Sequence, residues 1–342
     1  MASQLHMKLK NECFIIAEAG VNHNGDLQLA YKLVYEASKS GANAVKFQTF
    51  NADTLVNKSS TRAPYQQLSG DSLQHEMLSG LQLTYNEQAS IKQYCDTLGI
   101  EFISTAYDEQ AVTFLKSLGV KRIKIASADI INLPLLESVC ESGLPIIQST
   151  GMATLQEVER TYKFLKESKA PSISLLHCVT SYPLDIDQVN MRWINILQNR
   201  FDCEIGYSDH TLGTTVPIMA VTMGATILEK HFTLDRYMKG PDHYASLEPR
   251  DFQNMVSSIR DVEQAFGSTH FGVTDHEKEN IIPMRRSLHA AKKIIKGQTI
   301  HREDIAVLRP YTGIDPWSME SVIGSTAKID IELGTPITWD AI

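Results

Sequence analysis

Hydrophobic and polar positions along the chain alternate between two kinds of segment. Short runs rich in isoleucine, valine and phenylalanine recur, and longer amphipathic stretches separate them. Eight of the short runs are predicted to be strands: residues 14–17, 44–47, 101–103, 122–125, 145–147, 172–176, 203–205 and 226–228. Buried runs that alternate with helices are typical of a parallel sheet. Because eight strand–helix units are the number that closes a barrel, the pattern predicts an α/β fold, a (β/α)8 TIM barrel.

The amphipathic stretches between the runs predict the helices. Six of them have a clear hydrophobic face: residues 27–38, 85–98, 109–118, 133–141, 154–166 and 248–266. Gly41, Gly99, Gly119 and Gly143 follow four of these stretches. Glycine just after a helix accommodates the left-handed conformation that commonly ends it. These glycines therefore indicate where a helix stops before the next strand.

A long insertion interrupts this rhythm after the second predicted strand. It spans residues 51–80. At the carboxyl end of a barrel strand it would lie beside an active site. A loop without a function is an equally good interpretation, and the sequence leaves both open.

The pattern changes again after Gly267. Residues 1–267 are predicted to form the barrel, the polar residues 268–285 a linker, and residues 286–342 a small β-rich module with strands at 287–291, 306–308 and 336–338. A module of this size is marginally stable by itself. We therefore expect it to dock against another surface.

Composition excludes several classes of protein. The 342 residues include 43% hydrophobic and 21% charged residues, and the net charge is −8. This balance predicts a soluble globular protein without a nucleic-acid-binding surface, although a local cationic pocket for a small anion remains open. No apolar run approaches the ~20 residues of a membrane span. Five scattered cysteines and a polar N-terminus favour a cytoplasmic location without a disulfide framework.

Polar residues stand at the ends of all eight predicted strands, where a barrel of this kind places its active site. They include two lysines, several hydroxyls, two acids and the two imidazoles of His210 and His231. Lysines and hydroxyls hold phosphate and carboxylate oxygens through charge-assisted hydrogen bonds. Two imidazoles from adjacent strands suit a divalent transition metal with open positions. His177 is interpreted as a core residue, and His6, His75, His276, His289 and His301 as surface residues.

Seven segments together resemble the sialic acid synthase family, whose bacterial members make N-acetylneuraminate, legionaminate and pseudaminate. They occur in the family's order and are residues 14–25 (FIIAEAGVNHNG), 45–49 (VKFQT), 124–127 (KIAS), 149–152 (STGM), 208–211 (SDHT), 229–233 (EKHFT) and 240–243 (GPDH). The resemblance covers nearly the whole chain. It implies condensation of phosphoenolpyruvate with an N-acylated mannosamine-type sugar, with C–O cleavage, phosphate release and a divalent metal, most often Mn²⁺, with Mg²⁺ or Co²⁺ as alternatives.

The resemblance also implies a role for individual residues. Metal ligation falls on His210 and His231, and catalysis on Glu18, Lys46, Lys124 and Asp129. Substrate binding falls on Gln48, Thr105, Ser127, Ser149, Thr180, Tyr182, Ser208, Asp242 and Arg309. The tail resembles an antifreeze-like (SAF) domain, which in the family crosses to the other subunit of a domain-swapped homodimer. Arg309 would then contact the sugar, in a segment that reads Arg-Pro-Tyr-Thr-Gly where the family often has Arg-Pro-Gly-Asn-Gly.

Three questions stay open from the sequence. The acceptor is N-acetylmannosamine or 2,4-diacetamido-2,4,6-trideoxymannose, with a slight preference for the second from the segment 126–134. A Schiff-base aldolase is an alternative, because Lys46, Lys124 and Lys230 all follow predicted strands and a desolvated lysine can form an imine. A non-catalytic carbohydrate-binding protein is a further alternative.

Overall fold

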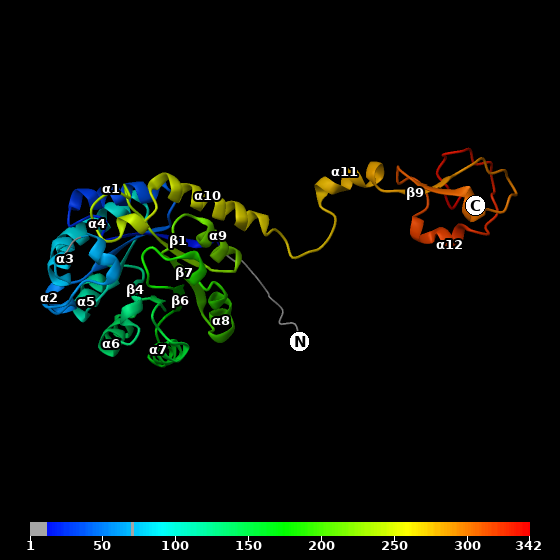
Figure 1. Ribbon diagram of the computed structural model, residues 1–342. Coiled ribbons are helices and arrows are strands. Elements are labelled where there is room, and N and C mark those ends of the chain that lie inside the picture. The colour runs from blue at the N-terminus through cyan, green and yellow to red at the C-terminus, as the bar shows by residue number, and fades with distance from the viewer. Residues whose placement is uncertain (1–11, 70–71) are drawn as a thin grey trace. The chain divides into compact units, whose positions relative to one another are not determined.

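The computed structural model describes residues 12–69 and 72–342, and eight parallel strands in it close into a barrel in chain order. The strands are β1 (Phe14–Gly20), β2 (Ala44–Thr49), β3 (Glu101–Ala106), β4 (Ile123–Ile125), β5 (Ile146–Ser149), β6 (Ile173–Cys178), β7 (Glu204–Asp209) and β8 (Ile227–His231). Helices surround this ring of strands (Figure 1). The predicted (β/α)8 barrel is therefore confirmed.

Most of the strands run further toward their carboxyl ends than the hydrophobic pattern predicts. The parallel ladder continues through polar pairs such as Glu18 with His231 and Ser208 with Glu229. Polar residues at these positions face the inside of the barrel mouth, so the hydrophobic signal stops while the backbone pairing does not. Several side chains predicted to follow the strands thus lie on them.

Two hydrophobic layers hold the barrel and set the depth of its mouth. Ile16, Ile103 and Leu176 belong to a small cluster to which six different strands contribute, so this cluster fills the interior. A much larger cluster, including Leu33 and Phe252, lies between the strands and the helices. Because the interior cluster closes the barrel from below, the polar ends of the strands form the floor of a cavity above it.

Successive strands are linked by α1 (Leu27–Lys39), α4 (Tyr85–Leu98), α5 (Glu109–Ser117), α6 (Leu133–Ser142), α7 (Leu155–Glu167), α8 (Arg192–Arg200) and α9 (Thr215–Thr222). Helix α10 (Pro249–Ala265) follows the last barrel strand, β8. The six predicted helices agree with their structural bounds to within one residue at each end. In α4 and α7 a threonine accepts from the third helical N–H while glutamate bonds back, which fixes where each helix begins. The apolar α9 has no hydrophobic face, so its sequence carries no helical period.

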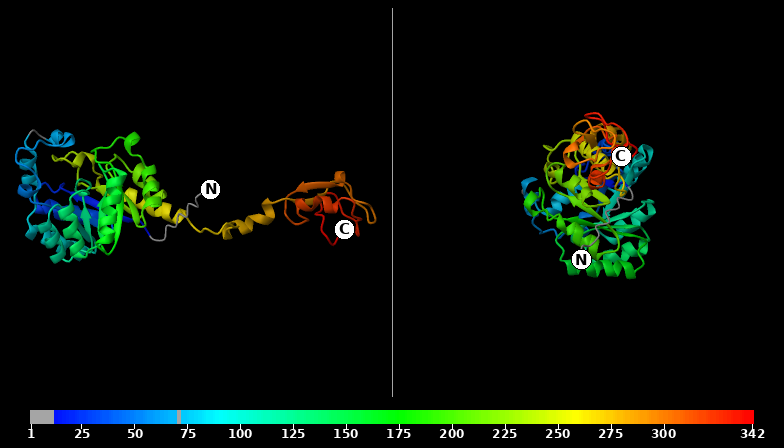
Figure 2. Two further views of the ribbon diagram at one scale, coloured as in Figure 1. Left: turned by 90° about the horizontal axis from the view of Figure 1, so that it is seen from below. Right: turned by 90° about the vertical axis from the view of Figure 1, so that its right-hand side faces the viewer.

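The insertion after β2 is folded and contains α2 (Ala52–Leu55), the short 3-10 helix η1 (Pro64–Ser69) and α3 (Gln74–Leu81). The left view in Figure 2 shows the blue helices of this insertion together at one edge of the barrel unit. Phe50, Leu81 and Val21 are buried together, and Leu55 and Leu78 pack on them. This small core anchors the insertion to the barrel.

The chain divides into two compact units, Met1–Gly267 and Ser268–Ile342. The second contains α11 (Asp275–Met284), a two-stranded antiparallel sheet of β9 (Ser287–Ala290) and β10 (Ile305–Leu308), and α12 (Met319–Val322), with 3-10 turns η5 (Arg302–Asp304) and η6 (Pro316–Ser318). Its own core includes Leu288, Ile300 and Ile337. The barrel unit also has the 3-10 turns η2 (Ser127–Asp129), η3 (Ile186–Gln188) and η4 (His243–Ala245).

Three local predictions for this second unit were wrong. Helix α11 lies within the predicted linker and was missed because its apolar residues Ile281, Ile282 and Met284 gather at its end and give no helical period. Thr274 and Glu277 form a capping box at its start. Residues 336–338 form only an isolated bridge between Pro336 and His289. His289, predicted at the surface, is buried on β9 and is only 2% exposed.

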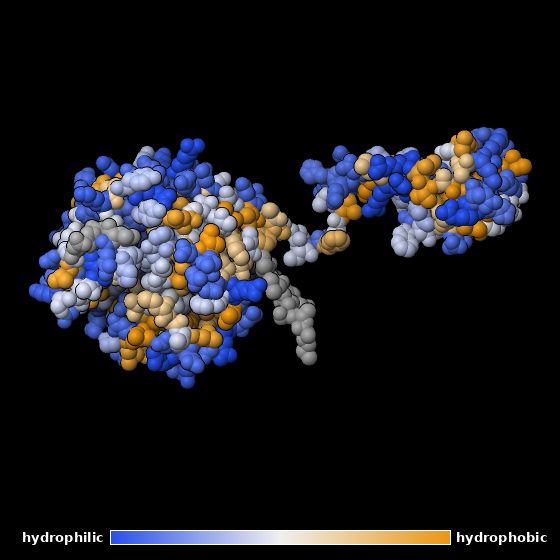
Figure 3. All heavy atoms as spheres, in the orientation of Figure 1, coloured by the Kyte–Doolittle hydropathy of each residue, from blue (hydrophilic) through white to orange (hydrophobic). Residues whose placement is uncertain are grey.

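The surface shows no membrane-spanning element among the described residues, since none of their helices is both long and apolar enough. Hydrophilic and hydrophobic residues are interspersed over the visible face of each unit (Figure 3).

Candidate active site

A cavity of about 320 Å³ opens at the carboxyl ends of the barrel strands. Its wall contains thirteen of the residues singled out from the sequence: Glu18, Lys46, Gln48, Thr105, Lys124, Ser127, Ser149, Thr180, Tyr182, Ser208, His210, His231 and Asp242. They come from all eight strands or the loops that follow them. The barrel therefore brings together nearly all the predicted residues that belong to its own unit.

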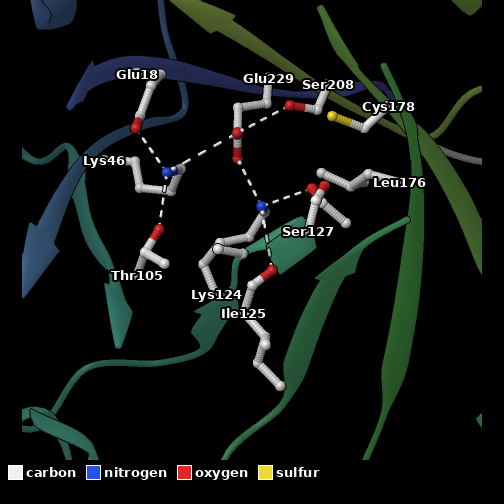
Figure 4. Close-up of polar contacts among 12 residues, drawn as sticks. Glu18, Lys46, Thr105, Lys124, Ile125, Ser127, Leu176, Cys178, Ser208 and Glu229 are labelled. Atoms are coloured by element: carbon white, nitrogen blue, oxygen red, sulfur yellow. Dashed lines mark hydrogen bonds and ion pairs between the residues drawn. The ribbon is translucent and has the colours of Figure 1, made fainter. Parts of the chain in front are cut away.

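Two buried lysines and two buried glutamates form the floor of this cavity (Figure 4). The Lys46 Nζ lies 2.7 Å from the Glu18 Oε2 and 3.8 Å from the Glu229 Oε1. The Lys124 Nζ lies 3.7 Å from the Glu229 Oε2. Glu229 thus stands between the two ammonium groups, and four side chains from β1, β2, β4 and β8 share one charge network.

Hydroxyl groups complete the floor around the lysines. The Lys46 Nζ donates to the Thr105 Oγ1 at 3.0 Å, and the Lys124 Nζ donates to the Ser149 Oγ at 2.7 Å. Ser208 donates to Glu229 at 3.1 Å. Within the described residues the buried Thr180 Oγ1 has no hydrogen-bond partner, so it is free to bind a ligand.

Gly151 lets the hydroxyls of Ser127 and Thr180 come close together at the cavity. Its backbone N–H donates to the Ser127 Oγ at 2.9 Å. A Cβ at this position would lie 2.4 Å from the Thr180 Oγ1 and 2.8 Å from the Ser127 Oγ, so any side chain would displace both hydroxyls. The glycine in the segment 149–152 is therefore required by the shape of the cavity.

Burial sets the charge state of the network. It raises the pKa of the Glu18 carboxyl to about 7, although Lys46 opposes the shift. Burial also lowers the pKa of Lys124, although the negative charge of Glu229 acts to raise it. The carboxyl of Glu229 is buried as well, but Lys124 and Lys46 hold its pKa below the usual value. Glu18 can therefore hold or release a proton near neutral pH, while Glu229 stays ionised.

This floor is suited to a small dianion or trianion. Two ammonium groups, buried and backed by hydroxyls, can replace water around phosphate and carboxylate oxygens. Because the cavity is largely shielded from solvent, each interaction is stronger than on the surface. The arrangement can thus hold a phosphorylated carboxylic acid at the bottom of the barrel mouth.

The imidazoles of His210 and His231 lie beside this floor, with ring centroids 5.4 Å apart. The His210 Nδ1 is 2.7 Å from the carbonyl of Val179, which only accepts hydrogen bonds, so Nδ1 carries the proton and Nε2 is free to ligate. The buried His231 Nδ1 has no hydrogen-bond partner within the described chain. Burial, with His210 and the nearby lysines, holds the pKa of His231 well below its usual range and keeps the ring neutral.

These features fit a divalent metal held by two protein ligands. A neutral imidazole with an unpartnered nitrogen is the form that binds a cation. Among the described residues no group of three or more His, Cys, Asp or Glu side chains forms a metal site. Substrate and water would therefore supply the other ligands, as the sequence predicts.

Comparison with known proteins places the chain in a family. The NeuB family model matches residues 33–271, and the SAF domain model matches residues 285–342. The chain belongs to the NeuB family.

Relatives within the NeuB family match over most of their length. An N,N'-diacetyllegionaminic acid synthase from Legionella pneumophila is 47% identical over 96% of this chain and 94% of its own. A second, from Campylobacter jejuni, is 40% identical over 92% of this chain and 95% of its own. Among solved structures, the N-acetylneuraminic acid synthetase of Leptospira borgpetersenii, in complex with citrate, is 35% identical, with a TM-score of 0.72 over 79% of this chain and 90% of that one.

Two predicted site residues are not in the cavity wall of this NeuB-family barrel. Asp129 lies on η2, and its Oδ1 accepts a hydrogen bond from Asn132 at 3.0 Å. It does not line the cavity. Arg309 follows β10 in the second unit, so its predicted contact with the sugar stays a prediction.

Lys230 does not support the aldolase alternative. It is fully buried, but it does not line the cavity and forms an ion pair with Asp209. Successive side chains on a strand point to opposite faces. Since Glu229 and His231 face the cavity, Lys230 faces the surrounding helices.

Several further cavity residues had no role predicted for them. Glu229 carried a signal, because it stands two positions before His231 and must share its face. Tyr65 and Met77 reach the cavity from the insertion, and Tyr65 stacks near Tyr182 with ring centroids 4.6 Å apart. Nothing in the polar composition of residues 51–80 marked these two. The insertion therefore lies beside the candidate site.

The segment Asn22-His23-Asn24, which follows β1, supports the loop after β8. The Asn22 Nδ2 donates to the Ser246 Oγ at 2.9 Å, and the Ser246 Oγ donates to the Asp242 carbonyl at 2.7 Å. The Asn24 Oδ1 lies 3.2 Å from the His243 Nε2. These bonds tie β1 to the loop after β8 and hold Asp242 at the cavity.

Replacing Asp242 by asparagine is expected to remove a pH-dependent part of the stability. Burial raises the pKa of the Asp242 carboxyl to about 6. Between about pH 4 and pH 6 the unfolded chain loses this proton while the folded chain keeps it. The contribution of protonated Asp242 to the free energy of unfolding is thus fully present below pH 4. It is lost as the pH rises through 6, and the total loss is about 2–3 kcal/mol at most.

Urea unfolding in the presence of a chelator at pH 4.5, 5.5 and 7 checks this expectation. The free energy of unfolding of the wild type should fall relative to Asp242→Asn across this range. Parallel pH curves for the two proteins would contradict it.

Proposed function

We propose that this chain is a nonulosonate synthase. It joins phosphoenolpyruvate to the open-chain aldehyde of an N-acylated mannosamine-type sugar and releases phosphate. The observation that carries the proposal is the buried floor of Lys46 and Lys124, backed by hydroxyls and adjoining the imidazoles of His210 and His231, in a barrel of the NeuB family. This combination matches an anionic enol phosphate beside a cation.

The acceptor proposed is 2,4-diacetamido-2,4,6-trideoxymannose, ahead of N-acetylmannosamine. The relatives at 47% and 40% identity are both named N,N'-diacetyllegionaminic acid synthases. Apolar side chains of the insertion, Leu55, Met77 and Leu78, line the cavity and suit a sugar with a methyl carbon and two acetamido groups. This acceptor class rests on both observations.

His210 and His231 would hold a divalent metal, with Mn²⁺ ahead of Mg²⁺ and Co²⁺. When bound, such an ion supplies Lewis-acid polarisation of the aldehyde oxygen. Lys46 and Lys124 bind and neutralise the phosphate and carboxylate, and Thr105, Ser127, Ser149 and Ser208 orient them. Tyr182, Gln48 and Asp242 line the sugar side.

In the reaction, the methylene carbon of phosphoenolpyruvate attacks the aldehyde carbon, and water adds to the central carbon that becomes electron-poor. Glu18 accepts the proton of this water, which suits a pKa near 7. The bond between that carbon and the phosphate oxygen then breaks. Asp129 remains an alternative acid from the family resemblance. Most of the rate enhancement comes from positioning and fixed charge.

Turnover with phosphoenolpyruvate and Mn²⁺ tests the function and the acceptor together. We expect phosphate release with both sugars and a kcat/KM at least about 10-fold higher for the diacetamido sugar, since one added apolar contact is worth about 1–3 kcal/mol. In water labelled with oxygen-18, the label should enter the nonulosonate and be absent from phosphate. Label in the phosphate, or borohydride trapping of a pyruvate–lysine adduct, would refute the proposed chemistry.

We also propose a cytoplasmic, domain-swapped homodimer in which Arg309 of one subunit contacts the sugar of the other. The SAF domain match to residues 285–342 and the small core of this unit support it. Sedimentation equilibrium should report a dimer, and Arg309→Ala should raise the KM for the sugar more than the KM for phosphoenolpyruvate. A fully active monomer would contradict the swap.

A further inference from the structure

A second ion pair lies behind the candidate metal ligands, on the outer face of the barrel wall. Asp209 ends β7 and Lys230 lies on β8, and both side chains are fully buried. The Lys230 Nζ and the Asp209 Oδ2 form an ion pair, and neither side chain lines the cavity. No substrate contact described so far uses them.

The position of this pair in the sheet links it to both imidazoles. Asp209 and Lys230 stand opposite each other in the β7–β8 ladder. His210 directly follows Asp209, and His231 directly follows Lys230. The ion pair therefore joins the two strands one residue before each ring, from the face opposite to the cavity.

Further hydrogen bonds fix the chain where it leaves β7. The Asp209 Oδ1 accepts from the hydroxyl of Tyr207 at 2.9 Å and from the backbone N–H of Thr211 at 3.1 Å. Lys230 also donates to the carbonyl of Thr211. The residues on both sides of His210 are thus held by one network, and Lys230 carries that network to β8.

The backbones of the two imidazole residues are also held. The His210 carbonyl accepts from the Leu184 N–H at 2.9 Å, in the loop that brings Tyr182 against the His210 ring. The His231 carbonyl accepts from the Leu247 N–H at 2.8 Å. Within this frame, the register between residues 209 and 230 is what sets the distance between the rings.

We propose that Asp209 and Lys230 are positioning residues that hold His210 and His231 at the separation a bound divalent cation requires. The inference rests on the proposed metal role of these histidines. A buried ion pair is seldom the most stable filling of its space, because apolar residues of similar volume are often as stabilising. A fully hydrogen-bonded ion pair does, however, allow only one arrangement of the two strands that carry it. Apolar packing alone is less specific.

The double variant Asp209→Leu with Lys230→Met tests the inference without leaving a lone buried charge. Isothermal titration of metal-free protein with Mn²⁺ should show binding about 10–100-fold weaker than in the wild type, as for other groups that orient metal ligands. The thermal midpoint without metal should fall by several degrees, because the buried Tyr207 hydroxyl and the Thr211 N–H lose their acceptor. At saturating Mn²⁺ the KM for phosphoenolpyruvate should be unchanged.

Leu228→Ala is the matched control. Leu228 is fully buried on the outer face of β8, two residues before Lys230. Its truncation should lower the thermal midpoint by several degrees while Mn²⁺ affinity stays at the wild-type value. Loss of metal affinity in this control would show that any damage to the wall weakens the site, and would overturn the specific role of the pair.

Asp209→Asn gives a second, milder variant. It keeps the shape of the side chain but removes the negative charge that pairs with Lys230. Mn²⁺ affinity should therefore fall, by a smaller factor than in the double variant. Wild-type affinity in whichever of the two variants folds would overturn the positioning inference and leave the proposed function intact. A wild-type protein that binds no Mn²⁺ would overturn both.

Discussion

Lys124→Met should lower kcat/KM for phosphoenolpyruvate by about 30- to 4,000-fold. The Lys124 Nζ is buried, donates to Ser149 and lies 3.7 Å from the Glu229 carboxylate. Methionine removes the charge, and Glu229 then faces the anionic substrate with only Lys46 to offset it. Removing one partner of a buried charge pair costs about 2–5 kcal/mol, which corresponds to this range. Steady-state kinetics with phosphoenolpyruvate as the varied substrate measures it.

Two further variants show whether the effect belongs to the cavity. Lys92→Met removes an ammonium group of α4 that pairs with Asp96 on the surface, and kcat/KM should stay within about 2-fold of the wild type. Lys124→Arg keeps the charge but not the compact ammonium, so it should recover only part of the activity. A change below about 10-fold in Lys124→Met would show that this lysine does not bind the substrate anion.

The barrel was predictable because its signal is repeated. Each buried strand and each amphipathic helix carries the same pattern. An error in the bounds of one element therefore leaves the number of strand–helix units unchanged. The helices missed as individual segments, α8 and α9, illustrate the limit. Apolar α9 packs without a polar stripe, and its residues 215–222 have no helical period to detect.

Most cavity residues were predictable for a different reason. In a parallel barrel the ends of distant strands meet at one mouth, so position along each strand is enough to group Lys46, Lys124 and His210. What the hydrophobic pattern could not show was where the strands end. The backbone pairing continues through Glu18 and Glu229 because their polar side chains line the cavity.

Alternation along β8 separates Glu229 and His231 from Lys230, and it distinguishes a cavity residue from one buried behind it. Residues outside the strands have no such rule. Asp129 sits on a 3-10 turn and Tyr65 on an insertion, and their directions depend on packing that one sequence does not encode by spacing.

His210→Ala and His231→Ala should each weaken Mn²⁺ binding by at least about 100-fold. Mutation even of groups that merely orient a metal ligand typically costs about 10–100-fold in affinity, so loss of one of only two protein ligands should cost more. The relevant nitrogen atoms are the free Nε2 of His210 and the Nδ1 of His231, which has no hydrogen-bond partner among the described residues and lies 3.9 Å from the Asp242 Oδ2. Isothermal titration of chelator-treated protein measures the affinity, and added Mn²⁺ should restore activity to the wild type alone.

His177→Gln separates metal ligation from the general loss of a buried imidazole. His177 is as buried as the other two, but its Nε2 lies 2.8 Å from the Val189 carbonyl, and its ring does not line the cavity. Glutamine can still donate to that carbonyl, so Mn²⁺ affinity should remain at the wild-type value even if stability falls. Equal loss of affinity in all three variants would mean that the rings support the barrel wall and that the cation, if bound, lies elsewhere. Loss confined to His210 and His231 would identify the pair as the ligands.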